Sequence, residues 1–157
     1  MKKELPMLIA LLFFSDSGIF AQQWIVTPNG NGDEVITAMA LDNNGNVYVT
    51  RYDYNANGES DYLTVKYNTS GVRQWQKRYN GPGSGDDKPR AISVDDGGNV
   101  YVTGISDAYP GYAIDNDVAT VKYSSQGSLL WTARYDGNIV REDAGNAIKV
   151  DASGWWG

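Results

Sequence analysis

The sequence repeats itself, and this repeat constrains the fold more than any single residue does. Residues 46–50 read Asn-Val-Tyr-Val-Thr and return at 99–103, and residues 64–67 read Thr-Val-Lys-Tyr and return at 120–123. The two segments recur after 53 and 56 residues. This spacing is close to the length of one four-stranded propeller blade and is too long for a leucine-rich or ankyrin repeat. The sequence therefore predicts an array of similar β units.

Each unit holds four short apolar stretches of alternating polarity, which is typical of antiparallel strands joined by turns. The first unit has them at 36–42, 46–51, 62–68 and 73–79, and the second at 90–95, 99–105, 117–124 and 129–135. Gly, Asn, Asp and Ser fill the turns between them, and no segment after residue 21 has a helical period. We expect an all-β fold, a β-propeller-like array of four-stranded antiparallel blades.

This array is expected to be incomplete. Blade 1 is predicted at 36–80 and blade 2 at 81–137. Residues 138–157 match the start of blade 2 and then lose the pattern at Trp155-Trp156, which predicts a truncated third blade. Residues 22–35 look like the outer strand of a blade followed by its loop, so they predict an orphan strand. The chain would then be the N-terminal fragment of a longer propeller, or the product of a truncated gene.

The first 21 residues have the pattern of a secretory signal peptide. Lys2 and Lys3 precede an apolar run at 5–14, and Ile19-Phe20-Ala21 is a suitable cleavage site. The run is too short for a stable membrane span, although a retained helical anchor is the alternative. We therefore predict a signal peptide at 1–21 and a secreted, periplasmic or cell-surface protein. The absence of Cys excludes a disulfide and a cysteine-linked lipid anchor.

Composition narrows the classes of function. The chain has 13 Lys and Arg against 19 Asp and Glu, a formal net charge of −6, which argues against nucleic acid or anionic lipid as a partner. The absence of His and Cys excludes the common serine triad, cysteine nucleophiles and most zinc sites. We expect no enzyme and no cofactor, with calcium kept open. A glycan-active enzyme that uses paired carboxylates, such as Asp86 and Asp87, is the less favoured alternative.

Acidic residues gather in the loops of one face of the predicted array. In an up-and-down blade, the loop between strands two and three and the loop into the next blade emerge on the same side. Their oxygens could hold calcium, which takes six to eight oxygen ligands, or could simply be solvated. The candidate calcium ligands are Asp33, Glu34, Asp86, Asp87, Glu142 and Asp143. The spacing Asp42-x-Asn44-x-Asn46 also resembles that of a calcium-binding loop, but a β-turn accounts for each of these residues.

Tyrosines on the same face form the second candidate site. The segment from Thr103 to Asp117 is longer than its counterpart in blade 1 and contains Tyr109 and Tyr112, and the loop of blade 1 offers Tyr52 and Tyr54. A ring beside carboxylates suits glycan binding, because rings pack on sugar C–H groups and acids accept hydroxyl hydrogen bonds. The alternative is that these rings only cover the loops. We expect a structural role for the residues that recur in the fourth strands, which are Trp75, Arg78 and Tyr79 in blade 1 and Trp131, Arg134 and Tyr135 in blade 2.

These residues resemble the bacterial β-propeller repeat family SBBP. Its units look like an apolar strand, Asp-x-x-Gly-Asn-Val-Tyr-Val-Thr-Gly, Asp-x-x-Thr-Val-Lys-Tyr, a Gly turn and Trp, and the resemblance covers nearly all of 23–151. The chain departs from this pattern at Arg51, where Gly104 is the family-like residue, and at Trp155-Trp156. The resemblance implies an extracellular scaffold or binding surface, with glycan or protein at the cell surface as partner. Open blade edges further predict association with the rest of a propeller or with another copy.

Overall fold

The computed structural model describes residues 8–15, 18–25, 35–83, 85–107, 116–137 and 142–151, and within these ranges the chain contains strands and no helix. The N-terminal strands are β1 (Leu8–Ser15) and β2 (Gly18–Ile25). They are followed by β3 (Val35–Leu41), β4 (Val47–Tyr54), β5 (Ser60–Tyr67) and β6 (Arg73–Tyr79). The last are β7 (Asp87–Val94), β8 (Val100–Asp107), β9 (Asn116–Tyr123) and β10 (Leu129–Tyr135). The predicted all-β fold is confirmed.

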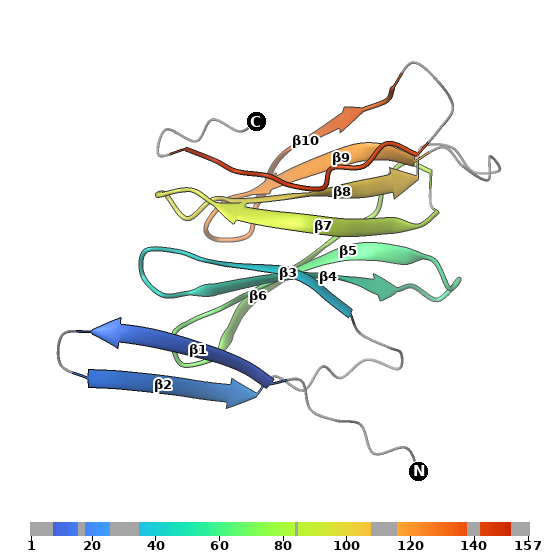
Figure 1. The fold of residues 1–157 in the computed structure, drawn as a ribbon. Helices are drawn as coiled ribbons and strands as arrows, with labels where there is room; N and C mark the ends of the chain where they lie inside the picture. The colour runs from blue at the N-terminus through green and yellow to red at the C-terminus, as the bar shows by residue number, and fades with distance from the viewer. Residues whose placement is uncertain are drawn as a thin grey trace, which may run out of the picture.

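Eight of these strands form two four-stranded antiparallel sheets, one for each repeat. The orders are β3-β4-β5-β6, called blade 1 below, and β7-β8-β9-β10, called blade 2. Figure 1 shows them as two stacked layers, with β7 lying over β3 and β4. The sheets do not close into a ring within the described residues. This arrangement agrees with the expected incomplete propeller.

The hairpin β1-β2 is a separate two-stranded sheet, in which Leu8 lies opposite Ile25 and Ser15 opposite Gly18. The predicted signal peptide and the first residues of the predicted orphan strand fall on this hairpin. The rest of that predicted strand, 26–34, lies outside the described residues. Both assignments stay predictions. No helix able to cross a membrane is found among the residues that the structure describes.

Strands β4 and β5 extend further than the sequence pattern indicated. They continue to Tyr54 and begin at Ser60, because a tight turn joins them: Asn55 Oδ1 accepts the N–H groups of Asn57 and Glu59, and Gly58 has a φ of +84°. The expectation that Tyr52 and Tyr54 lie in a loop is therefore wrong. Both belong to β4. The polar composition of this segment is typical of a loop, but the segment forms a hairpin in which the two strands stay paired up to the turn.

The two blades pack through the faces that they turn toward each other. We call the face of each sheet that carries Tyr48 in blade 1 and Tyr101 in blade 2 its front, and the opposite face its back. The front of blade 1 meets the back of blade 2. This interface is a cluster of buried residues, Tyr48, Tyr62, Val100, Val102, Ala119, Val121 and Tyr123, bordered by Trp75 and Tyr79. Full burial of a valine such as Val100, Val102 or Val121 stabilises the fold by about 1.5–3 kcal/mol. This interface is therefore the main core of the described fold.

Gly104 makes the close contact between blades possible. A Cβ at this position would lie 2.2 Å from the Lys88 carbonyl oxygen and 2.8 Å from the Tyr62 hydroxyl. The Tyr62 hydroxyl reaches over this gap to donate a hydrogen bond to the Ala119 carbonyl at 3.3 Å. Glycine is therefore required by a backbone and a ring that approach from two directions.

Residues 142–151 continue along blade 2 without forming a sheet of their own. The Asp143 N–H donates to the Asn116 carbonyl at 2.7 Å, and the Gly145 N–H donates to the Gly104 carbonyl at 3.3 Å. In Figure 1 this segment, in dark orange to red, runs alongside blade 2. It corresponds to β7 at an offset of 56 residues, so its place agrees with the start of the predicted third blade.

Candidate binding site at the blade boundary

Asp42 and Asp95 organise the first turn of each blade. The Asp42 carboxylate accepts the backbone N–H groups of Asn44 and Asn46, the Asn46 side-chain amide and the Tyr48 hydroxyl. Asp95 is bound in the same way by Asn99 and Tyr101. Burial raises the pKa of each carboxyl, but these hydrogen bonds outweigh it, so both pKa values are lowered. The structure thus gives the Asp42-x-Asn44-x-Asn46 segment the predicted turn.

Arginines of the outer strands hold aspartates of the third strands. In blade 1, Arg78 bonds Asp61 at 2.8 Å and Asp53 at 2.6 Å. In blade 2, Arg134 bonds Asp117 at 2.9 Å and the Ser106 hydroxyl at 2.6 Å. Burial lowers the pKa of each arginine, but the Asp61 and Asp53 carboxylates outweigh it at Arg78, and the Tyr79 hydroxyl and the Asp117 carboxylate outweigh it at Arg134, so both pKa values are raised. The arginines that recur in the sequence are therefore structural, as expected.

Arg134 also donates to the Tyr79 hydroxyl at 3.3 Å, so its guanidinium joins blade 2 to blade 1. Asp117 and Asp61 are almost fully buried, and the Oδ1 atom of each has no hydrogen-bond partner among the described residues. These buried charges are held by one arginine each. They mark the loop end of the sheets as the most polar part of the interior.

Asp86 and Asp87 point in different directions, although they are adjacent in sequence. Asp86 accepts from the Ser60 N–H at 3.0 Å, from the Ser60 hydroxyl at 2.9 Å and from Lys88 Nζ at 2.7 Å. Asp87 is buried and accepts the Gly81 N–H. Burial raises the pKa of Asp87 and outweighs the Gly81 and Ser106 hydrogen bonds, which lower it. One carboxylate thus faces the surface, and the other closes the loop between the blades.

Glu142 and Asp143 repeat this division. Glu142 pairs with Arg90 at 2.9 Å, and Asp143 accepts the Gly137 N–H at 2.7 Å. The other two candidate calcium ligands, Asp33 and Glu34, lie outside the described residues. No group of three or more acidic side chains that could hold a metal ion occurs in the part of the chain that the structure describes.

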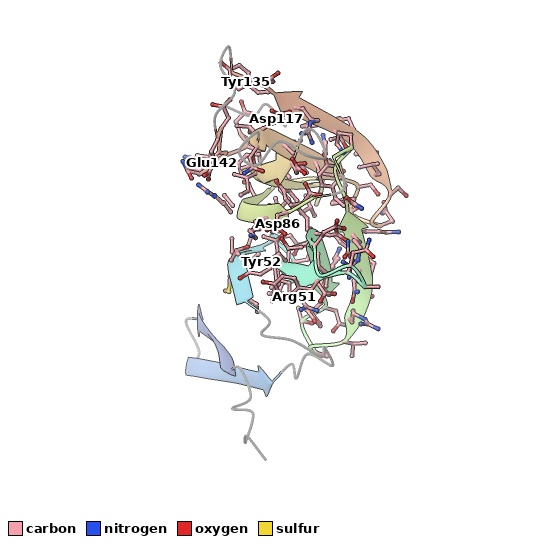
Figure 2. All side chains as sticks on the ribbon, turned by 90° about the vertical axis from the view of Figure 1, so that its right-hand side faces the viewer. Arg51, Tyr52, Asp86, Asp117, Tyr135 and Glu142 are labelled. Carbon is pink, nitrogen blue, oxygen red and sulfur yellow. The ribbon has the colours of Figure 1, made fainter. Side chains whose placement is uncertain are left out.

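Tyr52 and Tyr54 form an aromatic pair that borders blade 2. Their ring centroids are 5.8 Å apart in an edge-to-face arrangement, and Lys88 Nζ lies 5.9 Å from the centroid of the Tyr52 ring. Tyr54 is 49 % exposed, and the Asp86 carboxylate is 48 % exposed. Figure 2 views the molecule from this end and shows Asp86 above Tyr52. We call Tyr52, Tyr54, Asp86 and Lys88 the boundary patch. Tyr109 and Tyr112 lie outside the described residues.

Three residues of the boundary patch, Tyr52, Tyr54 and Lys88, have no equivalent in the other units, whereas its Asp86 has an acidic equivalent in Glu142. Ile105 and Asp107 occupy the positions of Tyr52 and Tyr54 in blade 2, and Ala144 stands where a second Lys88 would be. The recurring Asp and Arg residues are engaged in turns and ion pairs within the blades, whereas Tyr54, which does not recur, remains exposed. Tyr52 and Tyr54 were predicted from the sequence. The sequence did not point to Lys88 as a site residue, because the only feature that sets it apart is the lack of an equivalent lysine in the third unit.

The comparisons with known proteins agree with this architecture. The β-propeller repeat family SBBP matches residues 74–112, about a quarter of the chain. The matched segment runs from the outer strand of blade 1 through β7 and β8. No curated protein matches the chain. A repeat of this kind suggests a binding or scaffold module. Residues 74–112 are therefore similar to a β-propeller repeat of the SBBP family.

Proposed function

We propose that this chain is an exported, non-catalytic β-propeller repeat module that acts as an extracellular scaffold and binding surface. The observation that supports the proposal most is the contrast between its two kinds of polar residue. Recurring residues such as Asp95 and Arg134 are engaged in bonds within and between the blades. Residues that do not recur, such as Tyr54, remain exposed at the loop end.

We propose glycan binding at the boundary patch as the specific activity. The ring of Tyr54 offers an exposed apolar surface, and the neighbouring ring of Tyr52 holds it edge to face. Asp86 accepts hydrogen bonds from sugar hydroxyls, and Lys88 donates to sugar oxygens. The patch combines residues of both blades, so it exists only when the repeats are stacked.

A glycan array tests this activity. The wild-type chain is compared with the double variant Tyr52→Ala/Tyr54→Ala, and Gln76→Ala on β6 is the control for an exposed polar side chain elsewhere. Binding should fall at least about tenfold in the tyrosine variant, the effect of losing about 1.4 kcal/mol, and should be unchanged in the control. Equal glycan binding by all three proteins would remove this activity from the proposal.

A calcium-binding face is the second candidate, and the Oδ1 atoms of Asp61 and Asp117, which have no hydrogen-bond partner among the described residues, favour it. A hard cation at the loop end would satisfy such an oxygen, and backbone carbonyls, amides and water would have to supply its other ligands, because the described residues bring no group of three acidic side chains together. A ligand that binds only the folded state raises the melting temperature. Thermal unfolding in millimolar calcium and in chelator separates the candidates, because an unchanged midpoint would count against a calcium site.

Export and the lack of catalysis are tested on the same chain. Expression in a bacterium followed by N-terminal sequencing should give Gln22 as the first residue of the exported protein. Intracellular protein that starts at Met1 would contradict export. Incubation with any glycan that the array identifies should release no new reducing ends. Their release would favour the alternative of a carboxylate-based enzyme.

A further inference from the structure

Asn-Gly pairs recur in the turns of this chain, and the surroundings of these pairs differ. An asparagine followed by glycine can cyclise, because glycine has no Cβ to hinder attack of its backbone nitrogen on the asparagine side chain. Within the described residues the pairs are Asn44-Gly45 in the first turn of blade 1, Asn57-Gly58 between β4 and β5, and Asn80-Gly81 between the blades. In each pair the glycine N–H is hydrogen-bonded, so its nitrogen can reach the side chain only when the local structure opens. The pair in the least anchored turn should therefore react first.

The turn at 42–46 is tied to the rest of the fold. Its Asp42 carboxylate accepts a hydrogen bond at 3.0 Å from the hydroxyl of Tyr48, a fully buried residue of the main core. The Asn43 amide donates to Asp96 of blade 2 at 3.1 Å. Opening this turn would disturb contacts with the core and with the other blade, so its Asn-Gly pair is held in place.

The pair between the blades is enclosed by other parts of the fold. The Gly81 N–H donates to the carboxylate of Asp87, which is almost fully buried. Gly81 is itself buried, and a Cβ at this position would lie 2.2 Å from Ser106 Oγ. The backbone nitrogen of Gly81 therefore has no room to turn toward the side chain of Asn80.

The turn at 55–59 is held by bonds within the turn itself. Asn55 Oδ1 accepts the N–H of Asn57 at 2.9 Å and that of Glu59 at 3.1 Å, and Asn55 Nδ2 donates to Glu59 Oε2 at 3.0 Å. Asn57 is exposed, and a Cβ at Gly58 would have no described atom within 4 Å. This turn can therefore open without disturbing the core or the contact between the blades.

We propose that Asn57 is a site of spontaneous deamidation, which modifies the folded chain faster here than at the other two described Asn-Gly pairs. The Gly58 nitrogen attacks Asn57 Cγ and forms a C–N bond, and the side-chain nitrogen leaves as ammonia together with the proton of the Gly58 N–H. Water then opens the resulting succinimide ring at either of its carbonyls. Asparagine and water are thus converted into ammonia and either aspartate or isoaspartate.

The modification changes the hairpin that carries Tyr54. Both products add a negative charge to the turn that already holds the Glu59 carboxylate, and isoaspartate also lengthens the backbone by one carbon. A longer backbone no longer fits the hydrogen bonds to Asn55, so the pairing of Tyr54 with Ser60 beside the turn should loosen. An effect of this change on glycan binding rests on the function proposed for the boundary patch, whereas the modification itself does not.

Peptide mapping by mass spectrometry tests the site. The full chain is incubated in mildly alkaline buffer, and conversion of amide to carboxyl is followed at each Asn-Gly pair. In the folded chain Asn57 should convert at least about tenfold faster than Asn44. In denaturant the two rates should approach each other, because the fold no longer distinguishes the two pairs. Equal or faster conversion at Asn44 in the folded chain, or a rate ratio that persists in denaturant, overturns the proposal.

Two variants of the full chain test whether opening of the turns controls the reaction. Tyr48→Phe removes the hydroxyl that anchors the turn at 42–46, so conversion should rise at Asn44 and stay the same at Asn57. Asn55→Ala removes the bonds that hold the other turn, so it should raise conversion at Asn57 alone. If neither rate responds to its own variant, the proposal is overturned. These measurements use no glycan, so their outcome is independent of binding at the boundary patch.

Discussion

Blade 1 and blade 2 share their turns and ion pairs but differ where they meet other molecules or each other. Asp42 and Asp95 use the same donors, and Arg78 and Arg134 hold equivalent aspartates. By contrast, Tyr62 in blade 1 is Val118 in blade 2, and Arg51 in blade 1 is Gly104 in blade 2. The difference teaches that the repeat preserves the fold of a single blade, while unshared residues decide how the blades fit together.

The fit between the blades is a knob and a hole. Tyr62 projects from the front of blade 1 into the space left by Gly104 on the back of blade 2. Blade 1 has Arg51 and Leu63 where blade 2 has Gly104 and Ala119, so its own back face has no such hole. The two faces that meet are therefore specific for each other. Four experiments test this comparison.

The largest effect is expected for Gly104→Ala. The added Cβ would overlap the Lys88 carbonyl, which belongs to the backbone and cannot turn aside, so the free energy of unfolding should fall by about 3 kcal/mol. Urea unfolding measures it. Arg51→Ala, at the equivalent position of blade 1, is the control and should lose less than half as much. Equal losses would show that the hole has no special role.

Arg134→Met should have the next largest effect. It leaves the buried Asp117 without its arginine and breaks the contact with Tyr79, so we expect a loss of about 2 kcal/mol in the free energy of unfolding. Arg78→Met removes the equivalent pair in blade 1 but no contact between blades. Urea unfolding of both variants should give the smaller loss for Arg78→Met, and the reverse order would contradict a bridging role for Arg134.

The pH dependence of stability should have opposite signs at Asp87 and Asp95. Burial raises the pKa of Asp87 above its ordinary 3.8, so its stabilising contribution is present below that value and is lost as pH rises through the folded pKa. Hydrogen bonds outweigh burial at Asp95 and lower its pKa, so its contribution is present above 3.8 and is lost as pH falls.

Urea unfolding of Asp87→Asn and Asp95→Asn between about pH 3 and about pH 6 measures this difference. Relative to the wild type, Asp87→Asn should gain stability as pH rises, and Asp95→Asn should lose it. If the stability of the two variants changed with pH in the same way, the carboxyls of Asp87 and Asp95 would have the same environment.

The smallest effect is expected for Asn43→Ala. The Asn43 amide donates to Asp96 of blade 2 at 3.1 Å, and this exposed hydrogen bond joins two equivalent turns. Its loss should cost less than about 0.5 kcal/mol in the free energy of unfolding. A larger loss of stability would show that the contact between these two turns stabilises the fold more than its exposure to solvent indicates.

Much of the fold was predictable because its signals are local. The Asp-x-x-Gly-Asn turns and alternating strands recur at a fixed spacing, and the order of strands in each sheet follows from short connections. The segment 52–61 was misjudged, because its polar residues resemble a loop while its alternation belongs to β4 and β5. In the candidate site, the sequence named Tyr52 and Tyr54 for glycan binding and Asp86 as a calcium ligand, but it did not indicate that Lys88 reaches the Tyr52 ring.

The sequence by itself determined the repeat, the all-β class, the turns and the residues that hold each blade together. Only the tertiary structure decided that the Tyr62 side chain packs against Gly104 and that Arg134 donates to the Tyr79 hydroxyl of the other blade. It also decided that the Asp86 side chain lies at the surface while the Asp87 side chain is buried. The physical reason is the separation in sequence between the residues that make each contact. Turns and strand pairs depend on neighbours a few residues away, whereas these contacts depend on how two twisted sheets stack, which no local pattern of residues specifies.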